Sequence, residues 1–177
     1  MLIEKWEKIK TERVFDNFVK IDKVSFRMPD GKLKDFDIKA ADRDVVSVVG
    51  ITPDNKVILT KQFRPGPEKT FYEFPLGFIN KSEKPIEAAK REFLEETGYS
   101  GEFKKIGTEY INGYERLTTH CFIALNCRRV SKELKLDESE FIEVFLLPLA
   151  EVREMLKNAE IRNFGEGYLA LDFLGKL

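Results

Sequence analysis

Residues 77–99 have the sequence GFINKSEKPIEAAKREFLEETGY, and this stretch decides what the rest of the chain can be. The pattern predicts a helix from Pro85 to Thr97. Proline suits the first helical turn, the alanines that follow favour a helix, and Gly98 can end it in the left-handed conformation. Near the end of this predicted helix, acidic residues recur three and four positions apart, which is the spacing of neighbours on one helix face.

The acidic positions are Glu92, Glu95 and Glu96, and helical spacing places all of them on one face. Like charges side by side destabilise a helix unless something neutralises them, and a divalent cation would do so. Oxygen ligands without His or Cys favour Mg²⁺, with Mn²⁺ also possible. Such an ion can bridge pyrophosphate oxygens and activate water, so the face suits phosphoryl or nucleotidyl transfer to water. These three residues alone leave open a simpler alternative, a solvated charged face.

The whole stretch favours the metal-binding alternative over a solvated charged face, because its residue spacing resembles the Nudix box. The box has Gly, five residues, Glu, seven residues, then Arg-Glu-apolar-x-Glu-Glu-x-Gly-apolar. The fixed identities all agree, at Gly77, Glu83, Arg91, Glu92, Glu95, Glu96 and Gly98. With residue usage of roughly 5–7% each, such agreement has a chance probability on the order of 10⁻⁹ at a given start.

The resemblance implies roles for these positions. The last glutamates of the box, Glu92, Glu95 and Glu96, are expected to bind the metal, with a backbone carbonyl of Leu76 or Gly77 completing the shell. Glu83 and Arg91 resemble a pair that braces the loop against the helix. Together with Gly77 and Gly98 they are expected to be structural.

Outside the box, strands and helices alternate without a regular βαβ rhythm. Strands are expected near residues 44–52, 56–63, 102–111, 120–127 and 142–149, and helices near 149–158 and 165–174. The fold class is therefore α/β (α+β), a mixed β-sheet sandwiched between α-helices as in the Nudix fold. A hairpin at 18–28 and 34–40, turning at Pro29, Asp30 and Gly31, precedes it. We expect two parts, an antiparallel β extension at 1–44 and the Nudix hydrolase domain at 45–177.

Upstream of the box, the chain resembles the ADP-ribose pyrophosphatase branch of the family. The resemblance lies in a Gln-Phe-Arg element ending at Arg64 and in a Glu-x-Pro-x-Gly element that begins at Glu73. Both residues are expected to contact substrate. A guanidinium can bind phosphate oxygens with two hydrogen bonds, although a salt bridge from Arg64 to Glu68 or Glu73 is the structural alternative. The branch implies hydrolysis of ADP-ribose to AMP and ribose 5-phosphate.

Two departures keep other substrates open. Leu76 stands where the branch usually has Ala, and the branch's Pro after the box is absent. Tyr114 lies near that point and resembles a marker of dinucleoside polyphosphate hydrolases, which makes it a candidate substrate contact. GDP-mannose, dinucleoside polyphosphates, oxidised nucleoside triphosphates and a non-catalytic sensor of nucleotides are the alternatives.

The general base is also open. In the ADP-ribose branch it can come from a mobile acidic loop, and the sequence DESEF supplies Glu138 and Glu140 at the matching place. A solvated loop is the plain alternative for both residues. Glu95 is the other candidate, if it activates water rather than binding metal.

Composition limits the partners. Lys and Arg number 30 against 31 Asp and Glu, so the net charge of −1 provides no broad cationic field for nucleic acid or membrane. No run approaches the eighteen apolar residues of a membrane span, and we expect a cytoplasmic protein.

The extension resembles the branch's dimerising sheet, which predicts a homodimer, with Phe18, Phe26 and Phe36 as candidates for stacking on a base. The cysteines Cys121 and Cys127 are expected on one strand face in the core, too far apart for a disulfide.

Overall fold

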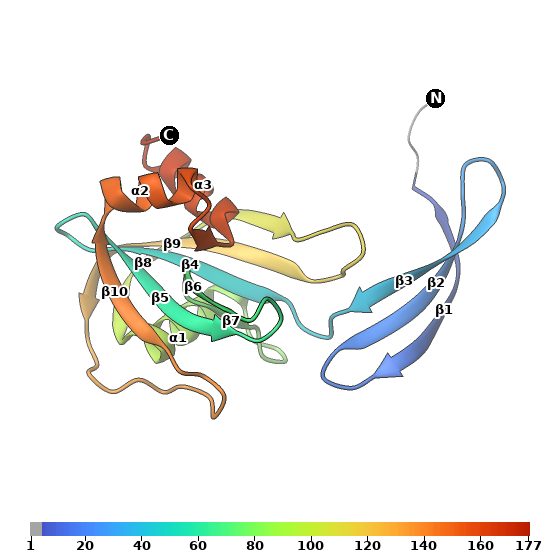
Figure 1. Ribbon diagram of the computed structural model, residues 1–177, viewed down its shortest axis with the longest axis horizontal. Helices are drawn as coiled ribbons and strands as arrows, with labels where there is room; N and C mark the ends of the chain where they lie inside the picture. The colour runs from blue at the N-terminus through green and yellow to red at the C-terminus, as the bar shows by residue number, and fades with distance from the viewer. Residues whose placement is uncertain (1–4) are drawn as a thin grey trace. The chain divides into compact units, whose positions relative to one another are not determined.

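The computed structural model describes residues 5–177, so residues 1–4 of the predicted extension lie outside the described part. The chain forms two compact units. One consists of the chain up to Arg43 together with Tyr110–Thr118, and the other of Asp44–Glu109 with Thr119–Leu177 (Figure 1). The segment Tyr110–Thr118, expected in the hydrolase domain, thus groups with the smaller unit. It does so through ion pairs from Arg116 to Asp22 and from Lys39 to Glu115.

The smaller unit is an antiparallel sheet in the order β1 (Glu7–Asp16), β2 (Lys20–Arg27), β3 (Leu33–Ala40). The predicted hairpin between β2 and β3 is confirmed, and its turn contains Gly31 at a φ of 83°. Most of β1 was not expected from the sequence. All ten of its residues are exposed, so no buried face leaves a periodic signal in this strand.

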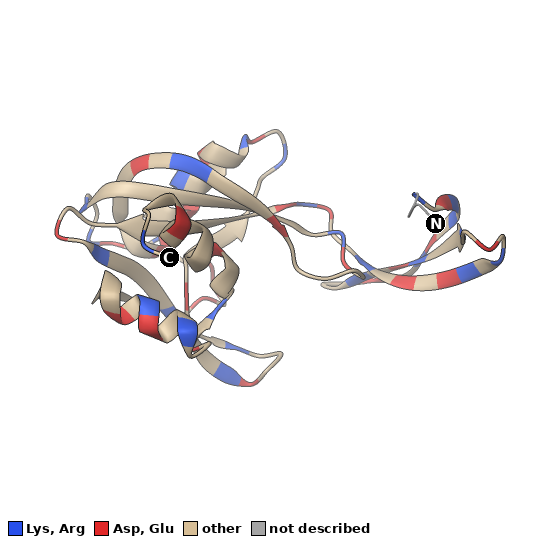
Figure 2. Ribbon diagram, turned by 90° about the horizontal axis from the view of Figure 1, so that it is seen from above, with Lys and Arg blue, Asp and Glu red and all other residues tan. Residues whose placement is uncertain are grey.

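Basic and acidic residues alternate along these strands rather than gathering by sign, as Figure 2 shows. The described part of the smaller unit therefore presents no single-sign face to attract a polyanion. No helix in residues 5–177 is long and apolar enough to cross a membrane.

The larger unit contains a mixed eight-stranded sheet in the order β11-β6-β5-β4-β9-β8, with β10 paired to β5 and β7 paired to β4. Its strands are β4 (Val45–Ile51), β5 (Lys56–Arg64), β6 (Lys69–Glu73), β7 (Leu76–Phe78), β8 (Tyr99–Tyr110), β9 (Thr118–Arg129), β10 (Glu143–Pro148) and β11 (Ile161–Arg162). The helices are α1 (Pro85–Thr97), α2 (Leu149–Lys157) and α3 (Phe164–Phe173). The parallel pairs are β4 with β9 and β6 with β11, as the predicted mixed sheet requires.

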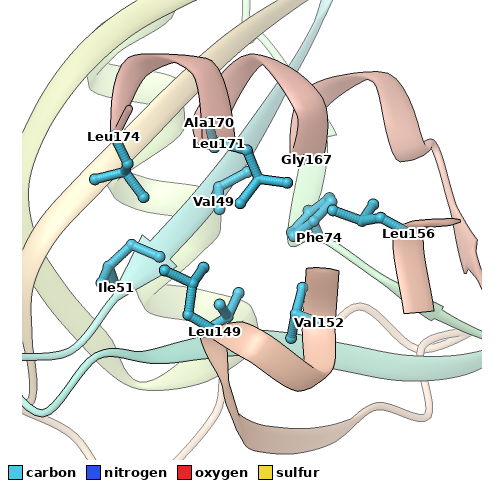
Figure 3. A pocket seen from close by; sticks show the side chains of 11 residues that line it. Val49, Ile51, Phe74, Leu149, Val152, Leu156, Gly167, Ala170, Leu171 and Leu174 are labelled. Carbon is cyan, nitrogen blue, oxygen red and sulfur yellow. The ribbon is translucent and has the colours of Figure 1, made fainter. Parts of the chain in front are cut away.

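The helices cover both faces of this sheet, because β4 is buried along its whole length and alternates between two cores. Val46 and Val48 pack with Phe93 of α1 on one face. Val49 and Ile51 pack with residues of α2 and α3 on the other. Figure 3 shows a cavity in this second core, lined entirely by apolar residues. The sheet sandwiched between helices is confirmed, and this cavity is a packing void rather than a polar site.

The two cysteines are free and buried, as expected, but their predicted placement on one face was wrong. Asn126 adopts a φ of 55°, which breaks the alternation of β9 just before Cys127. Cys127 therefore packs with Phe122 and Ala124 on the α1 face, whereas Cys121 lies on the opposite face with Ile123. A single left-handed residue is enough to move every later side chain across the sheet.

The end of α1 gives the first testable prediction. Gly98 has a φ of 76°, and a Cβ there would stand 2.4 Å from the Ser131 carbonyl oxygen. We expect Gly98→Ala to lower the free energy of unfolding by about 2 kcal/mol, through left-handed strain and this overlap. Urea unfolding measures the effect. Gly66→Ala is the control, because its Cβ would meet nothing within 4 Å; equal losses in both variants would contradict the explanation.

Candidate functional site

The three glutamates of the predicted metal site project from the last turns of α1, which the buried Phe93 anchors to the sheet. Their side chains differ in exposure: Glu95 is 31% exposed, Glu92 17%, and Glu96 only 2% as a residue. The helix therefore presents one carboxylate to solvent and holds the other two progressively deeper. A ligand that reaches Glu96 has to be small.

Glu96 is the most constrained of the three. The Leu76 N–H donates to its Oε2 over 3.1 Å, which ties α1 to β7. Burial raises the pKa of Glu96 well above its usual value, and the negative charges of Glu140 and Glu92 raise it further. One backbone hydrogen bond does not offset that burial. A bound cation would stabilise the carboxylate in its charged form.

The absence of a side chain at Gly77 makes room for the Glu92 carboxylate. A Cβ on Gly77 would lie 2.1 Å from the Glu92 carboxyl carbon, so that carboxylate occupies the space a side chain would take. The first glycine of the box is thus needed for close approach between β7 and α1 rather than for an unusual φ. The peptides of Leu76 and Gly77 consequently lie against Glu96 and Glu92, as expected if one of their carbonyls joins these ligands.

Arg91 braces the loop before α1. Its guanidinium donates to both oxygens of Glu83, at 2.9 and 2.8 Å, and to the Phe78 carbonyl at 3.0 Å. The Arg91 hydrogen bond holds the pKa of Glu83 below its usual value. The same guanidinium donates to Glu92 at 2.7 Å and to Glu95 at 3.1 Å. Arg91 therefore partly neutralises the acidic face.

The glutamates of the box can be assessed as ligands for a metal ion. Among residues 5–177, the ligand atoms of Glu92, Glu95 and Glu96 do not gather within 4.8 Å of one another as one compact group. The donor set nevertheless fits Mg²⁺, since it consists of carboxylates, and the buried one at Glu96 has a pKa well above its usual value that a cation would lower. Glu92 and Glu95 would exchange part of their contact with Arg91 for the ion.

A second charged cluster lies at the end of β5 and β6. Glu73 is completely buried and accepts two hydrogen bonds from Arg64 Nε, at 2.9 and 3.1 Å, and one from Arg64 Nη2 at 2.5 Å. Arg162 donates to the same carboxylate at 2.5 and 3.1 Å. Burial alone would raise the pKa of Glu73, but the two guanidinium groups outweigh it and the pKa lies below the usual value.

This arrangement divides the roles that the sequence assigned to Arg64 and Glu73. The Glu73 carboxylate is inaccessible, so it can position the arginines but cannot itself contact a substrate. The side chains of Arg64 and Arg162 remain 28% and 34% exposed. Arg64 also lies within electrostatic range of Glu96 and Glu140. Arg162 was missed by sequence reasoning, because the parallel pairing of Arg162 with Glu73 joins residues that are far apart in the chain.

The two candidate bases in the acidic loop, Glu138 and Glu140, lie in different environments. Glu140 is half-buried, and its charge contributes to the raised pKa values of both Glu92 and Glu96. Its Oε2 accepts the Asp137 N–H at 2.9 Å, which fixes the turn. Glu138 is exposed and contributes to neither of those shifts. Of the two, Glu140 is therefore the one whose charge acts on Glu92 and Glu96.

The remaining candidates belong to the smaller unit. Tyr114 is 61% exposed and stacks on Phe36 at a ring-centroid distance of 6.4 Å. Phe36 also contacts Phe26 and Trp6, so these rings form one aromatic cluster. Phe18 is 97% exposed and has no ring partner among the described aromatic residues. The candidate contacts Tyr114, Phe26 and Phe36 thus share one surface, and Phe18 does not belong to it.

Comparison with known proteins identifies the family. A model of the NUDIX domain matches residues 41–166, which include the whole box and both charged clusters. The chain belongs to the Nudix hydrolase family. This Nudix hydrolase is 31% identical over 170 residues to an ADP-ribose pyrophosphatase of Bacillus subtilis (strain 168), covering 95% of the chain and 89% of that protein. It is 35% identical over 147 residues to an ADP-sugar pyrophosphatase of Mus musculus, covering 74% and 67%.

The fold agrees with that assignment. A crystal structure described as an ADP compounds hydrolase superposes with a TM-score of 0.82 and covers 100% of both chains. Its sequence identity to this Nudix hydrolase is 20%, so the match establishes the common fold.

Proposed function

We propose that this Nudix hydrolase cleaves the pyrophosphate bond of an ADP-sugar, with ADP-ribose hydrolysed to AMP and ribose 5-phosphate, and that it requires Mg²⁺ or Mn²⁺. The observation that carries the proposal is the position of Arg64, whose partly exposed guanidinium is held by Glu73 within electrostatic range of Glu96. A cationic fork beside an acidic metal face suits a diphosphate. The named relatives act on ADP-ribose and ADP-sugars, which supports the same substrate class.

Each residue then has a defined task. Glu92, Glu95 and Glu96 would hold the ion, with a carbonyl of Leu76 or Gly77. When bound, the ion neutralises charge on the diphosphate and lowers the pKa of water. Arg64 and Arg162 would bind non-bridging phosphate oxygens, oriented by the buried Glu73. Water adds its oxygen to one phosphorus as the bridging P–O bond breaks, and a carboxylate accepts the water proton.

We propose Glu140 as that carboxylate. Glu140→Gln should lower kcat roughly 10²-fold, because an amide cannot accept the proton, and should leave KM nearly unchanged. Steady-state kinetics with ADP-ribose and Mg²⁺ measure both constants. Glu138→Gln is the matched control and should retain activity within about twofold. A larger loss in the Glu138 variant than in the Glu140 variant would reverse the assignment.

A substrate panel tests the proposed function itself. ADP-ribose, ADP-glucose, GDP-mannose, diadenosine polyphosphates and nucleoside triphosphates are each incubated with Mg²⁺, and phosphatase releases phosphate from newly formed monoesters. Highest kcat/KM for ADP-ribose supports the proposal. Highest kcat/KM for diadenosine polyphosphates would replace it and make Tyr114 the better guide, and no turnover of any substrate would favour a nucleotide sensor.

The predicted homodimer and cytoplasmic location remain predictions of the same proposal. Light scattering coupled to gel filtration tests the first, and a mass of one chain of 20.6 kDa would contradict it.

A further inference from the structure

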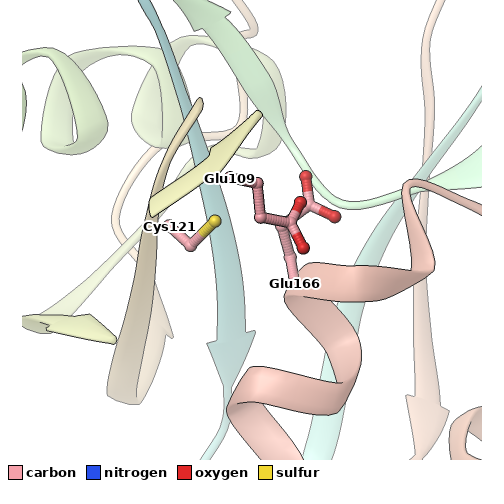
Figure 4. Close-up of side chains that lie close together, drawn as sticks. All are labelled: Glu109, Cys121 and Glu166. Atoms are coloured by element: carbon pink, nitrogen blue, oxygen red, sulfur yellow. The ribbon is translucent and has the colours of Figure 1, made fainter. Parts of the chain in front are cut away.

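A group of polar side chains lies beneath α3, on the face of the sheet opposite α1. It consists of Glu109 at the end of β8, Cys121 at the start of β9, and Glu166 in the first turn of α3. Figure 4 shows the thiol and both carboxylates pointing toward one another. One ligand atom from each lies within 4.8 Å of the other two, the one such group among the described His, Cys, Asp and Glu residues.

Two members of the group, Cys121 and Glu166, are buried, and the positive charges of Lys105 and Arg162 do not offset that burial. Cys121 is 0% exposed and Glu166 1%, and Glu166 Oε2 has no hydrogen-bond partner. The pKa of Glu166 is raised to about 8, chiefly by burial and also by the nearby Glu109, although Ser47 and Arg162 act to lower it. Burial also raises the pKa of Glu109, and no cation lowers it. A buried carboxylate beside a second, partly buried carboxylate and a buried thiol is unfavourable without a positive charge among them.

Ser47 supplies an independent observation at the same place. Its Oγ is completely buried and also has no hydrogen-bond partner. Ser47 pairs with Cys121 in the parallel register of β4 and β9, and its side chain alternates with those of Val46 and Val48, which face α1. The hydroxyl therefore points under α3, close enough to Glu166 to lower the pKa of that carboxyl. The buried side-chain oxygens without partners in residues 5–177 both belong to this cluster.

The chemistry of the donors selects the ligand. Buried polar atoms without partners mark a place where a water or an ion is bound. A thiol beside two carboxylates is a poor site for Mg²⁺ or Ca²⁺, which prefer oxygen alone, and a good one for Zn²⁺. The Cys121 thiol donates a weak hydrogen bond to the Thr119 carbonyl at 3.8 Å, but a proton shared by the carboxylates would still leave the Ser47 Oγ without a partner. A four-coordinate ion accounts for all of them.

We propose that Glu109, Cys121 and Glu166 bind a Zn²⁺ ion, separate from the metal of the Nudix box, with Ser47 or a water in the fourth position. The ion would connect α3 to β8 and β9. Tetrahedral Zn²⁺ with bonds of about 2.0–2.3 Å requires the ligand atoms to draw in by less than about 1.5 Å, which rotation of side chains can supply. Gly165 makes this possible, since a Cβ there would lie 1.9 Å from Glu109 Oε1.

Cobalt titration under reducing conditions tests the proposal on the full chain. Co²⁺ substitutes for Zn²⁺ in such sites, and a thiolate ligand gives it an intense ligand-to-metal charge-transfer band that carboxylates do not. The expected result is one equivalent of this band per chain, abolished by one equivalent of Zn²⁺ and unaffected by excess Mg²⁺. Because the box donors are all oxygen, the readout is independent of hydrolase activity and of the proposed function.

Cys121→Ser should lose the band, and Cys127→Ser is the matched control that should keep it. Both cysteines are free and buried, but no carboxylate lies in a metal-binding group with Cys127. Glu166→Gln, which keeps the thiol, should weaken Co²⁺ binding at least tenfold and decides the matter if Cys121→Ser fails to fold. A wild type without the band, or a band that survives in Cys121→Ser, would overturn the proposal.

Discussion

Replacing Glu96 with Gln should lower kcat on ADP-ribose by on the order of 10³-fold or more at saturating Mg²⁺. A metal that neutralises developing charge contributes several kcal/mol to the transition state, and each 1.36 kcal/mol is tenfold in rate. Folding should not suffer. Glutamine keeps the shape, its carbonyl can still accept the Leu76 N–H, and it removes a charge whose burial is unfavourable.

Lost activity together with retained stability would show that the substitution affects turnover rather than folding. Kinetics and thermal unfolding are measured on the same preparations, with Glu87→Gln as control. Glu87 lies on the same helix and accepts the Lys84 N–H at its start, a contact that glutamine can also make. Unchanged turnover in Glu96→Gln would show that the acidic face of α1 does not carry the chemistry.

Glu73→Gln, unlike Glu96→Gln, should cause a large loss of stability. The substitution leaves two guanidinium groups around one neutral side chain, and removing one partner of a buried ion pair typically costs about 3–5 kcal/mol. Because Arg64 and Arg162 are 28% and 34% exposed, we expect about 3 kcal/mol, measured by urea unfolding at neutral pH. The KM for ADP-ribose should also rise, since both arginines lose their orientation.

The pH dependence of unfolding checks the cause. The pKa of Glu73 in the folded state is lowered from the ordinary glutamate value of 4.5. A group with a lowered folded pKa contributes stability above its unfolded pKa, and that stability is lost as pH falls through the folded value. The difference between wild type and Glu73→Gln should therefore shrink below about pH 4.5. Glu68→Gln, at an exposed residue of the β5–β6 turn, is the control; a difference independent of pH would exclude the ion pairs as the cause.

Much of the chemistry could be predicted from local sequence, because it depends on residues that are close along the chain. Helical spacing alone brings Glu92, Glu95 and Glu96 to one face, and the same helix ends at Gly98 as expected. The hairpin turn at Gly31 and the layered fold also followed from local patterns. A strand such as β1 could not be located in this way, since a fully exposed strand leaves no hydrophobic period.

By itself, then, the sequence determined the family, the acidic face of α1 and the mixed sheet between helices. Only the tertiary structure decided which distant residues meet. Parallel pairing of β11 with β6 brings Arg162 to Glu73, and the packing of α3 on the sheet brings Glu166 to Cys121. It also buried Glu73 and placed Glu140 where its charge acts on Glu96. The physical reason is that periodicity and capping act over a few residues, whereas burial and charge pairing depend on contacts that only the folded chain creates.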